Sequence, residues 1–327
     1  MAQRPEGPDF KAQAQAARAD LERQFAETRA QFDQARAQFD QVNERITART
    51  GRNLVFATAI GVGVGAVVLA SLIFVSALFM VFAAAAFALA VVELGTALRV
   101  AGRDIPRTAG VIAALAMIPA SFYLTGDWRW YVTLAGMALV VIWRLVEYAW
   151  PGRRGGGDAL VRDLAASILV QAYIPLLGSF AVLLAAPQNA DGRWWLVAML
   201  IVVVAVDTGA YAAGLNFGRH KMAPTISPGK TWEGFAGAFV AAAAAGILLS
   251  IFMLHVPWWF GFIYGGVLLL TATAGDLAES LIKRDIGVKD MSGWLPGHGG
   301  VLDRLDSILP SAAAAYALYV IFHPIFF

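Results

Sequence analysis

Two polar segments in the mostly apolar part of the chain, residues 53–327, carry the residues whose types suit chemistry. The first runs from Asp207 to Gly234 and the second from Gly275 to Ser307. Together they supply carboxylates, basic side chains, hydroxyls and many glycines. Magnesium prefers carboxylate oxygens and substrate phosphates, glycine lets backbone N–H groups approach a phosphate, and basic side chains neutralise phosphate charge. The two segments therefore indicate a site for phosphate and a divalent cation.

Helical spacing groups several of these side chains. If the helix that enters the second segment continues to about Lys283, four polar residues lie three, four and seven positions apart, which places them on one face. They are Asp276, Glu279, Ser280 and Lys283.

A turn follows that helix. The sequence PGHGG at 296–300 cannot form regular helix, and Asp303 and Asp306 come shortly after it. Asp276 and Asp303 could therefore flank one metal ion from the two ends of a re-entrant loop. A carboxylate pair near a glycine-rich loop favours nucleotidyl or phosphoryl transfer. A charged loop that stabilises itself by salt bridges is the alternative.

The composition of the chain places these segments in a membrane protein. Of 327 residues, 59% are hydrophobic and 15% are charged, and the mean hydropathy is +0.63, whereas soluble domains have about 45–50% apolar and about 25% charged residues. Residues 1–52 hold 17 of the 48 charged side chains. The chain has no cysteine, which excludes disulfides and thiolate chemistry, and its net charge of +2 gives no reason to expect a nucleic acid partner.

We predict an all-α polytopic membrane protein with about nine transmembrane helices, since each span needs about 20 apolar residues. The uncharged stretch from Leu54 to Val92 fits two spans, divided near Ser71–Ser76. The others are expected at about 108–126, 129–149, 163–187, 194–213, 233–254, 257–282 and 306–326.

The basic residues of the predicted loops indicate the orientation. The loops after the second, fourth, sixth and eighth spans hold thirteen Lys and Arg residues, and the opposite loops hold two, Arg129 and Arg193. The positive-inside rule then puts the N-terminus inside and the C-terminus outside. We expect an integral protein of the inner-membrane type.

Acidic residues inside the spans lie at the same predicted end. Ionisable groups in a span are costly and usually face a polar cavity, so these acids indicate one cytoplasm-facing polar site. For one of them, Glu147, pairing with Arg144 three residues earlier is the favoured interpretation. The acids are Glu93, Glu147, Asp207, Asp276 and Glu279.

The chain divides into an N-terminal cytoplasmic helical extension, residues 1–52, and a transmembrane domain, residues 53–327. In the extension, Phe25, Phe32 and Phe39 are seven apart, a spacing typical of an amphipathic or coiled-coil helix. Oligomerisation or docking is one interpretation of this helix, and packing on the membrane surface or on the protein itself is the other.

The second polar segment resembles the signature of the phosphatidate cytidylyltransferases, also called CDP-diacylglycerol synthases. The matching positions are Ser280, Ile282, Lys283, Arg284, Lys289, Asp290, Ser292, Leu295, Pro296, His298, Gly299, Gly300, Asp303, Arg304 and Asp306. The first segment is also similar, through Asp207–Tyr211, Ser227–Pro228, Lys230–Thr231 and Glu233–Gly234. It departs at Leu215, where the family often has Arg, and at Arg219, where the family often has Lys. This departure bears on one basic contact and not on the resemblance to the family.

The resemblance implies a reaction. Such enzymes condense CTP with phosphatidic acid, giving CDP-diacylglycerol and pyrophosphate, and they need a divalent cation, usually magnesium. In-line attack by the lipid phosphate on the α-phosphorus of CTP needs no covalent intermediate. The resemblance also implies a homodimer in membrane lipid.

The resemblance further implies roles for the site residues. Asp276 and Asp303 would bind the metal, and Asp207 would hold a second cation or position CTP. Phosphate ligands would be Lys283, Arg284, Lys289 and Arg304, with Lys230 and Arg219 as weaker candidates for the lipid headgroup. His298 would contact a phosphate, help pyrophosphate leave, or only order the turn. The remaining substrate-binding candidates are Ser227, Ser280, Asp290, Gly299 and Gly300, of which the two serines would orient phosphate or metal-bound water.

Two other functions are alternatives to this one. A CTP-dependent lipid kinase of the same superfamily would transfer the γ-phosphate and leave CDP, so its products differ. A secondary transporter would place polar groups near the bilayer midplane between repeated halves, whereas here the acids lie at one end of the spans and no repeat of spans is detected.

Thr231 and Glu233 could simply cap a helix.

Overall fold

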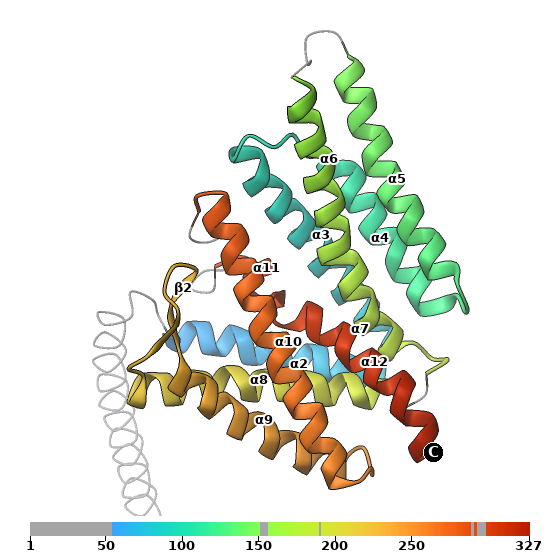
Figure 1. Ribbon diagram of the computed structural model, residues 1–327. Coiled ribbons are helices and arrows are strands. Elements are labelled where there is room, and N and C mark those ends of the chain that lie inside the picture. Colours follow the sequence, from blue (N-terminus) through green and yellow to red (C-terminus); the bar gives the residue numbers. More distant parts are fainter. Residues whose placement is uncertain (1–53, 151–155, 190, 289–290, 293–298) are drawn as a thin grey trace, which may run out of the picture. The chain divides into compact units, whose positions relative to one another are not determined.

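The computed structural model describes residues 54–150, 156–189, 191–288, 291–292 and 299–327 (Figure 1). The chain separates into two compact units, Met1–Val62 and Gly63–Phe327. The contacts that build the polar site all lie within the second unit. The helix predicted within residues 1–52 lies outside the described residues.

The described residues are helical almost throughout. The helices in chain order are α2 (Leu54–Phe74), α3 (Ser76–Val100), α4 (Arg107–Tyr123), α5 (Trp128–Ala149), α6 (Gly157–Gln171), the π-helical turn η1 (Ala172–Leu176), α7 (Leu177–Ala185), α8 (Gly192–Phe217), α9 (Trp232–Phe252), α10 (Trp258–Asp285), α11 (Leu302–Leu305) and α12 (Ile308–Phe326). A hairpin of two short strands, β1 (Lys221–Ala223) and β2 (Ser227–Thr231), connects α8 to α9.

Seven helical segments in the described part of the chain are long and apolar enough to cross a membrane. They are Ser76–Val100, Trp128–Ala149, Gly157–Ala185, Gly192–Phe217, Trp232–Phe252, Trp258–Asp285 and Leu302–Phe326. Two further apolar helices, Gly61–Phe74 and Arg107–Tyr123, are shorter. The helical fold with several spans is thus confirmed, and the count of nine spans stays a prediction.

Two interruptions of regular helix have local causes. The predicted division near Ser71–Ser76 is present, because Val75 has a non-helical backbone (φ −146°) between α2 and α3. Pro175 has no N–H to donate, and its ring crowds the preceding turn of an α-helix. It lies in the wider π turn Ala172–Leu176, and the helix continues on both sides of that turn.

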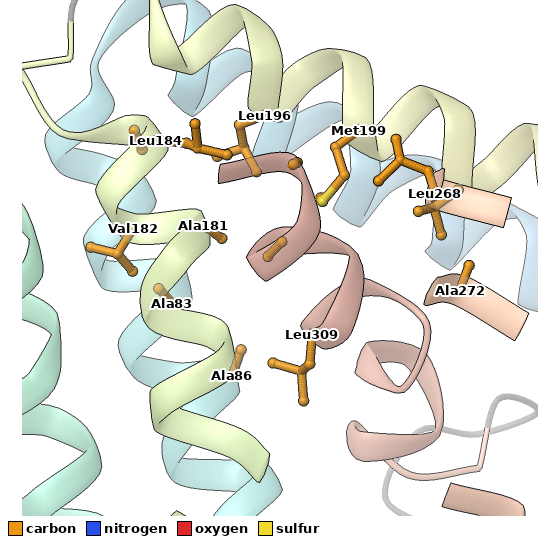
Figure 2. Packing of buried hydrophobic residues seen from close by; sticks show 14 of the residues in the cluster. Ala83, Ala86, Ala181, Val182, Leu184, Leu196, Met199, Leu268, Ala272 and Leu309 are labelled. Carbon is orange, nitrogen blue, oxygen red and sulfur yellow. The ribbon is translucent and has the colours of Figure 1, made fainter. Parts of the chain in front are cut away.

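The apolar core lies between α3, α7, α8, α10 and α12 (Figure 2). α3 contributes small residues such as Ala83 together with large ones such as Phe87. By contrast, most apolar side chains of α5 are exposed, which suits a lipid environment because lipid tails are as apolar as leucine. Core residues in Figure 2 are Ala83, Ala86, Val182, Leu196, Met199, Leu268, Ala272 and Leu309.

The polar end of α10 lies close to the start of α12. A Cβ built on Gly275 would lie 2.1 Å from the carbonyl oxygen of Asp306, so no larger residue fits between these backbones. This close approach brings Asp276 beside the chain that carries Asp303 and Asp306.

The region between α8 and α9 differs from its predicted form. α8 continues to Phe217, so Asp207–Tyr211 lies inside a helix and not at the end of a span. The following residues, expected as a loop, form the antiparallel hairpin, in which Lys221 faces Thr231 and Ala223 faces Ser227. The predicted capping role of Thr231 is confirmed, since its Oγ1 accepts a hydrogen bond from the N–H of Gly234 (3.1 Å).

Candidate active site

A cavity of about 280 Å³ opens between α8, the hairpin, α9 and α10. Its polar lining comes from three elements: Asp207 on α8, Lys230 and Thr231 on β2, and Thr273 and Asp276 on α10. The apolar lining includes Val206, Met222, Phe235, Ala238 and Ala272. The cavity therefore brings residues of both polar segments together.

Asp276 and Lys230 form an ion pair at this cavity. The Nζ of Lys230 lies 2.8 Å from Oδ2 of Asp276, and the side chains are 20% and 36% exposed. On the other carboxylate oxygen, Ser280 donates a longer hydrogen bond (3.4 Å). The carboxylate is thus held in place while remaining open to solvent.

Asp207 contributes a second carboxylate to the same cavity. Its side chain is exposed, and no described residue forms a hydrogen bond or ion pair with it. An oxygen of this kind is available to a cation or to a hydroxyl of a bound molecule.

A second cluster lies one helical turn further along α10. The Nζ of Lys283 is 2.5 Å from Oε2 of Glu279 and 2.9 Å from Oδ1 of Asp303. Glu279 is fully buried, and the other two side chains are mostly buried. One ammonium group therefore compensates two carboxylates. Removing any member of such a buried cluster would leave an uncompensated charge, which is costly in folding free energy.

The helix face predicted from spacing is present. α10 extends to Asp285, and the contacts Ser280–Asp276 and Lys283–Glu279 are both of the i, i+4 type. Pairing of Glu147 with Arg144 is also confirmed, at 3.7 Å.

The loop before α11 presents Asp303 to this cluster. Gly299 has a positive φ of 80°, and the N–H of Gly300 donates to Oδ2 of Asp303 (2.7 Å). Both carboxylate oxygens of Asp303 therefore have partners, one from the loop and one from Lys283.

Glu93 of α3 contacts this loop, a contact that sequence spacing did not indicate. Its carboxylate accepts hydrogen bonds from the N–H groups of Val301 (2.9 Å) and Leu302 (2.8 Å). The signal that pointed to it was a lone acid in an apolar span. What the sequence lacked was any indication of its partner.

The other predicted residues lie around the hairpin and on α11. Arg284 donates through Nε to the carbonyl of Ile226 in the hairpin turn (3.3 Å), Ser227 lies on β2, and Arg304 is exposed on α11. Lys289, Asp290 and His298 lie outside the described residues.

Arg219 and Glu233 meet at the base of the hairpin. Glu233 accepts from the N–H of Arg219 (3.0 Å) and lies 2.6 Å from Nδ1 of His220. Glu233 therefore reaches back to close the hairpin, in addition to lying in the first turn of α9.

The carboxylates suit a magnesium ion that is shared with a substrate. No three His, Asp or Glu side chains converge as a metal site within the described residues. Magnesium, however, is commonly held by one or two carboxylates together with substrate phosphates and water. Asp207 and Asp276 offer such oxygens at one cavity, so the donor set fits the ion.

The cavity brings carboxylates and a lysine together among helices long enough to span a membrane, and these groups suit phosphate and a divalent cation. The chain belongs to the cytidylyltransferase family, whose family model matches residues 56–322. It is therefore a nucleotidyltransferase, and the predicted family is confirmed.

Named relatives from mycobacteria match most of the chain. It is 40% identical over 284 residues to a phosphatidate cytidylyltransferase of Mycobacterium leprae, which covers 83% of this chain and 89% of that protein. The corresponding protein of Mycobacterium tuberculosis H37Rv is 40% identical over 279 residues, with 83% of each chain covered. A phosphatidate cytidylyltransferase of Haemophilus influenzae is 42% identical over 136 residues, covering 40% of this chain and 46% of its own.

Proposed function

We propose that this chain is an integral-membrane phosphatidate cytidylyltransferase, which converts CTP and phosphatidic acid to CDP-diacylglycerol and pyrophosphate. The observation that carries the proposal is the cavity that Asp207, Lys230 and Asp276 line together. Its carboxylates and lysine suit a nucleoside triphosphate with a divalent cation, and relatives along most of the chain bear this enzyme's name.

The reaction is a single in-line displacement. An oxygen of the phosphatidate phosphate forms a bond to the α-phosphorus of CTP, and the bond from that phosphorus to the bridging oxygen of the β-phosphate breaks. Pyrophosphate leaves with the electron pair. Because the nucleophile is already an anion, the protein need only position the two phosphates and neutralise their charge.

The lysines of the site carry out that neutralisation. Lys230 and Lys283 are each ion-paired with a carboxylate, Asp276 and Asp303. A lysine ammonium is a compact charge on a flexible stem, so it can turn from its carboxylate to a phosphate oxygen. Arg284, Lys289 and Arg304 would add charge around the triphosphate and the lipid phosphate.

Carboxylates released in this way would hold the cation. We assign magnesium to Asp276 and Asp303, and we assign a second cation or the positioning of CTP to Asp207. Magnesium would neutralise triphosphate charge and favour departure of pyrophosphate.

The proposed orientation follows from the basic loops. CTP would bind from the cytoplasm and phosphatidic acid from the inner leaflet, with the N-terminus inside and the C-terminus outside. A homodimer is the proposed assembly.

Product analysis with two labels tests the proposal. Purified protein in detergent–lipid micelles receives phosphatidic acid, magnesium and CTP labelled in either the α- or the γ-phosphate. We expect the α-label in CDP-diacylglycerol and the γ-label in pyrophosphate, with loss of both products in Asp303→Asn and after chelation of magnesium.

The matched control is Asp127→Asn. Asp127 is exposed and lies just before the first residue of α5, so this variant should keep full activity. A γ-label found in lipid, with CDP as the other product, would show a lipid kinase and overturn the proposal.

A further inference from the structure

Glu93 is a buried acid at the meeting point of two distant parts of the chain. It lies on α3 and its relative exposure is 1%. Its Oε1 accepts hydrogen bonds from the hydroxyl of Ser292 and the N–H of Val301, and its Oε2 accepts from the N–H of Leu302. Residues 292 and 301, on either side of the glycine-rich turn of the signature, therefore meet at one carboxylate oxygen.

Within the described part of the chain, these three donors are the partners of the Glu93 carboxylate. Among the described residues, no Lys, Arg or His forms an ion pair with it. A buried carboxylate without compensating partners is strongly unfavourable, and three hydrogen bonds to a charged acceptor supply that compensation. The loop depends on Glu93 in turn, since removal of Glu93 would leave the buried N–H of Leu302 without its acceptor.

The fit between Glu93 and the loop is close. A Cβ on Gly300 would lie 2.9 Å from both carboxylate oxygens of Glu93, so the carboxylate rests directly against the α-carbon of this glycine. Gly300 in turn donates its N–H to Asp303, and Asp303 pairs with Lys283. A continuous line of contacts thus joins α3 to the two residues assigned to metal and phosphate.

We propose that Glu93 is a positioning residue for nucleotidyl transfer. It fixes the backbone of residues 300–302 and thereby the direction of the Asp303 carboxylate and the Lys283 ammonium. Its role differs from that of Glu147, an acid near the end of α5, which pairs with an arginine. The catalytic part of this inference rests on the proposed function, whereas the ordering of the loop does not.

Hydrogen exchange of the full-length protein in micelles tests the loop. In Glu93→Ala we expect the amides of Val301 and Leu302 to exchange at least about tenfold faster than in the parent, with the amides of α8 and α9 unchanged. Glu93→Gln retains one carbonyl oxygen as acceptor and should show a smaller increase. The matched control Glu147→Gln should leave exchange in the loop unchanged.

Steady-state kinetics on the same variants test the catalytic part. A misdirected Asp303 affects the transition state more than the bound substrates, so kcat of Glu93→Gln should fall roughly 10- to 100-fold. KM for CTP should stay within about threefold of the parent, because binding groups remain present. Glu93→Asp, which keeps the charge, should recover part of kcat.

Each outcome decides one part of the inference. Unchanged exchange at Val301 and Leu302 in both Glu93→Gln and Glu93→Ala would overturn the role in loop order. Faster exchange with kcat within twofold of the parent would overturn the catalytic role. If the parent itself formed no CDP-diacylglycerol, the proposed function would fail, and the exchange result would still stand. Should Glu93→Ala not fold, Glu93→Gln gives the same comparison.

Discussion

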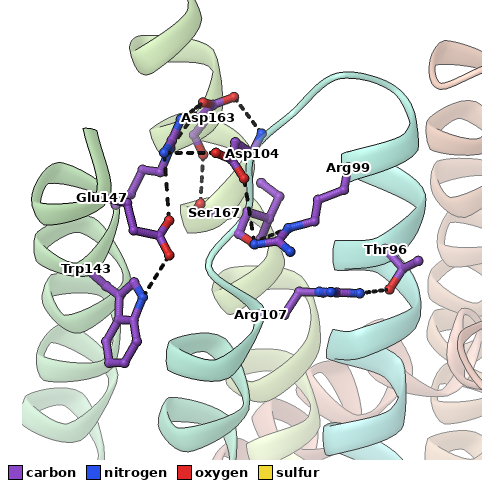
Figure 3. Close-up of polar contacts among 10 residues, drawn as sticks. Thr96, Arg99, Asp104, Arg107, Trp143, Glu147, Asp163 and Ser167 are labelled. Carbon is purple, nitrogen blue, oxygen red and sulfur yellow. Dashed lines mark hydrogen bonds and ion pairs between the residues drawn. The ribbon is translucent and has the colours of Figure 1, made fainter. Parts of the chain in front are cut away.

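Two polar clusters near helix ends differ in the cation that pairs with their acidic side chains: one uses an arginine and the other uses lysines. In the first, Arg144 of α5 is the centre, and Figure 3 labels its partners Asp104, Glu147 and Asp163. Its guanidinium lies 2.7 Å from Asp163, 3.1 Å from Asp104 and 3.7 Å from Glu147. Arg144 and Asp163 are both 5% exposed. We refer to these four residues as the arginine cluster.

The second cluster pairs its acids with lysines. Asp276 is held by Lys230, and Asp303 and Glu279 are held by Lys283. Asp276 and Lys230 also line the cavity, whereas no member of the arginine cluster does. We refer to these five residues as the lysine cluster.

The two cations differ in how they bind acceptors. A guanidinium has five donors in a rigid plane and can join several acceptors at once. Arg144 accordingly connects α5 to α6 and to the α3–α4 loop, where Asp104 also accepts a contact from Arg99. A lysine ammonium can exchange partners, which a phosphate-binding site requires. We therefore propose that the arginine cluster serves folding and that the lysine cluster serves chemistry.

The largest expected effect is that of Lys283→Met. This change removes the cation that pairs with both Glu279 and Asp303, and it removes a proposed phosphate ligand, so turnover should fall about a thousandfold. Formation of CDP-diacylglycerol by purified protein measures it. Lys221→Met, on the exposed strand β1, is the matched control and should stay within about twofold of the parent. Loss below tenfold in Lys283→Met would contradict the assignment.

Arg144→Met should mainly change stability. Removing one partner of a buried ion pair leaves uncompensated charge on Asp163, at a cost of about 3–5 kcal/mol in unfolding free energy. Denaturant unfolding in mixed micelles measures this cost. Turnover per folded molecule should remain near the parent value. A stable Arg144→Met protein that has lost turnover would break the proposed division between the clusters.

Lys230→Arg has the smallest expected effect. It places the cation of the arginine cluster in the lysine cluster, so it tests the comparison most finely. The charge is kept, but a planar guanidinium binds Asp276 with more than one donor and exchanges less readily. We expect kcat to fall roughly tenfold, which corresponds to about 1.4 kcal/mol, with thermal stability unchanged or raised. Equal kcat values for the lysine and arginine forms would show that exchange of partners is not required at this position.

Features of the site that depend on one helix could be predicted from the sequence. The face that joins Asp276, Ser280 and Lys283 follows from the helical period, and α10 has that face. The pairing of Arg144 with Glu147 follows from the same rule. Membrane-length helices follow from apolar length alone.

Features that depend on distant contacts could not be predicted in this way. Glu93 and Leu302 are separated by 209 positions, and no periodicity reports such a contact. Asp163 was not singled out, because its partner Arg144 lies on another helix. The hairpin was also missed, since β1 has only three residues and shows no alternation of apolar and polar side chains.

One paired measurement tests the division between the two clusters most directly. Asp276→Asn and Asp163→Asn make the same chemical change in the lysine and arginine clusters. Turnover of CTP to CDP-diacylglycerol and thermal unfolding are measured on both variants under the same conditions. We predict that Asp276→Asn loses turnover and keeps the unfolding temperature, and that Asp163→Asn loses stability and keeps turnover per folded molecule. The reverse pattern, or the same loss in both variants, would contradict this account.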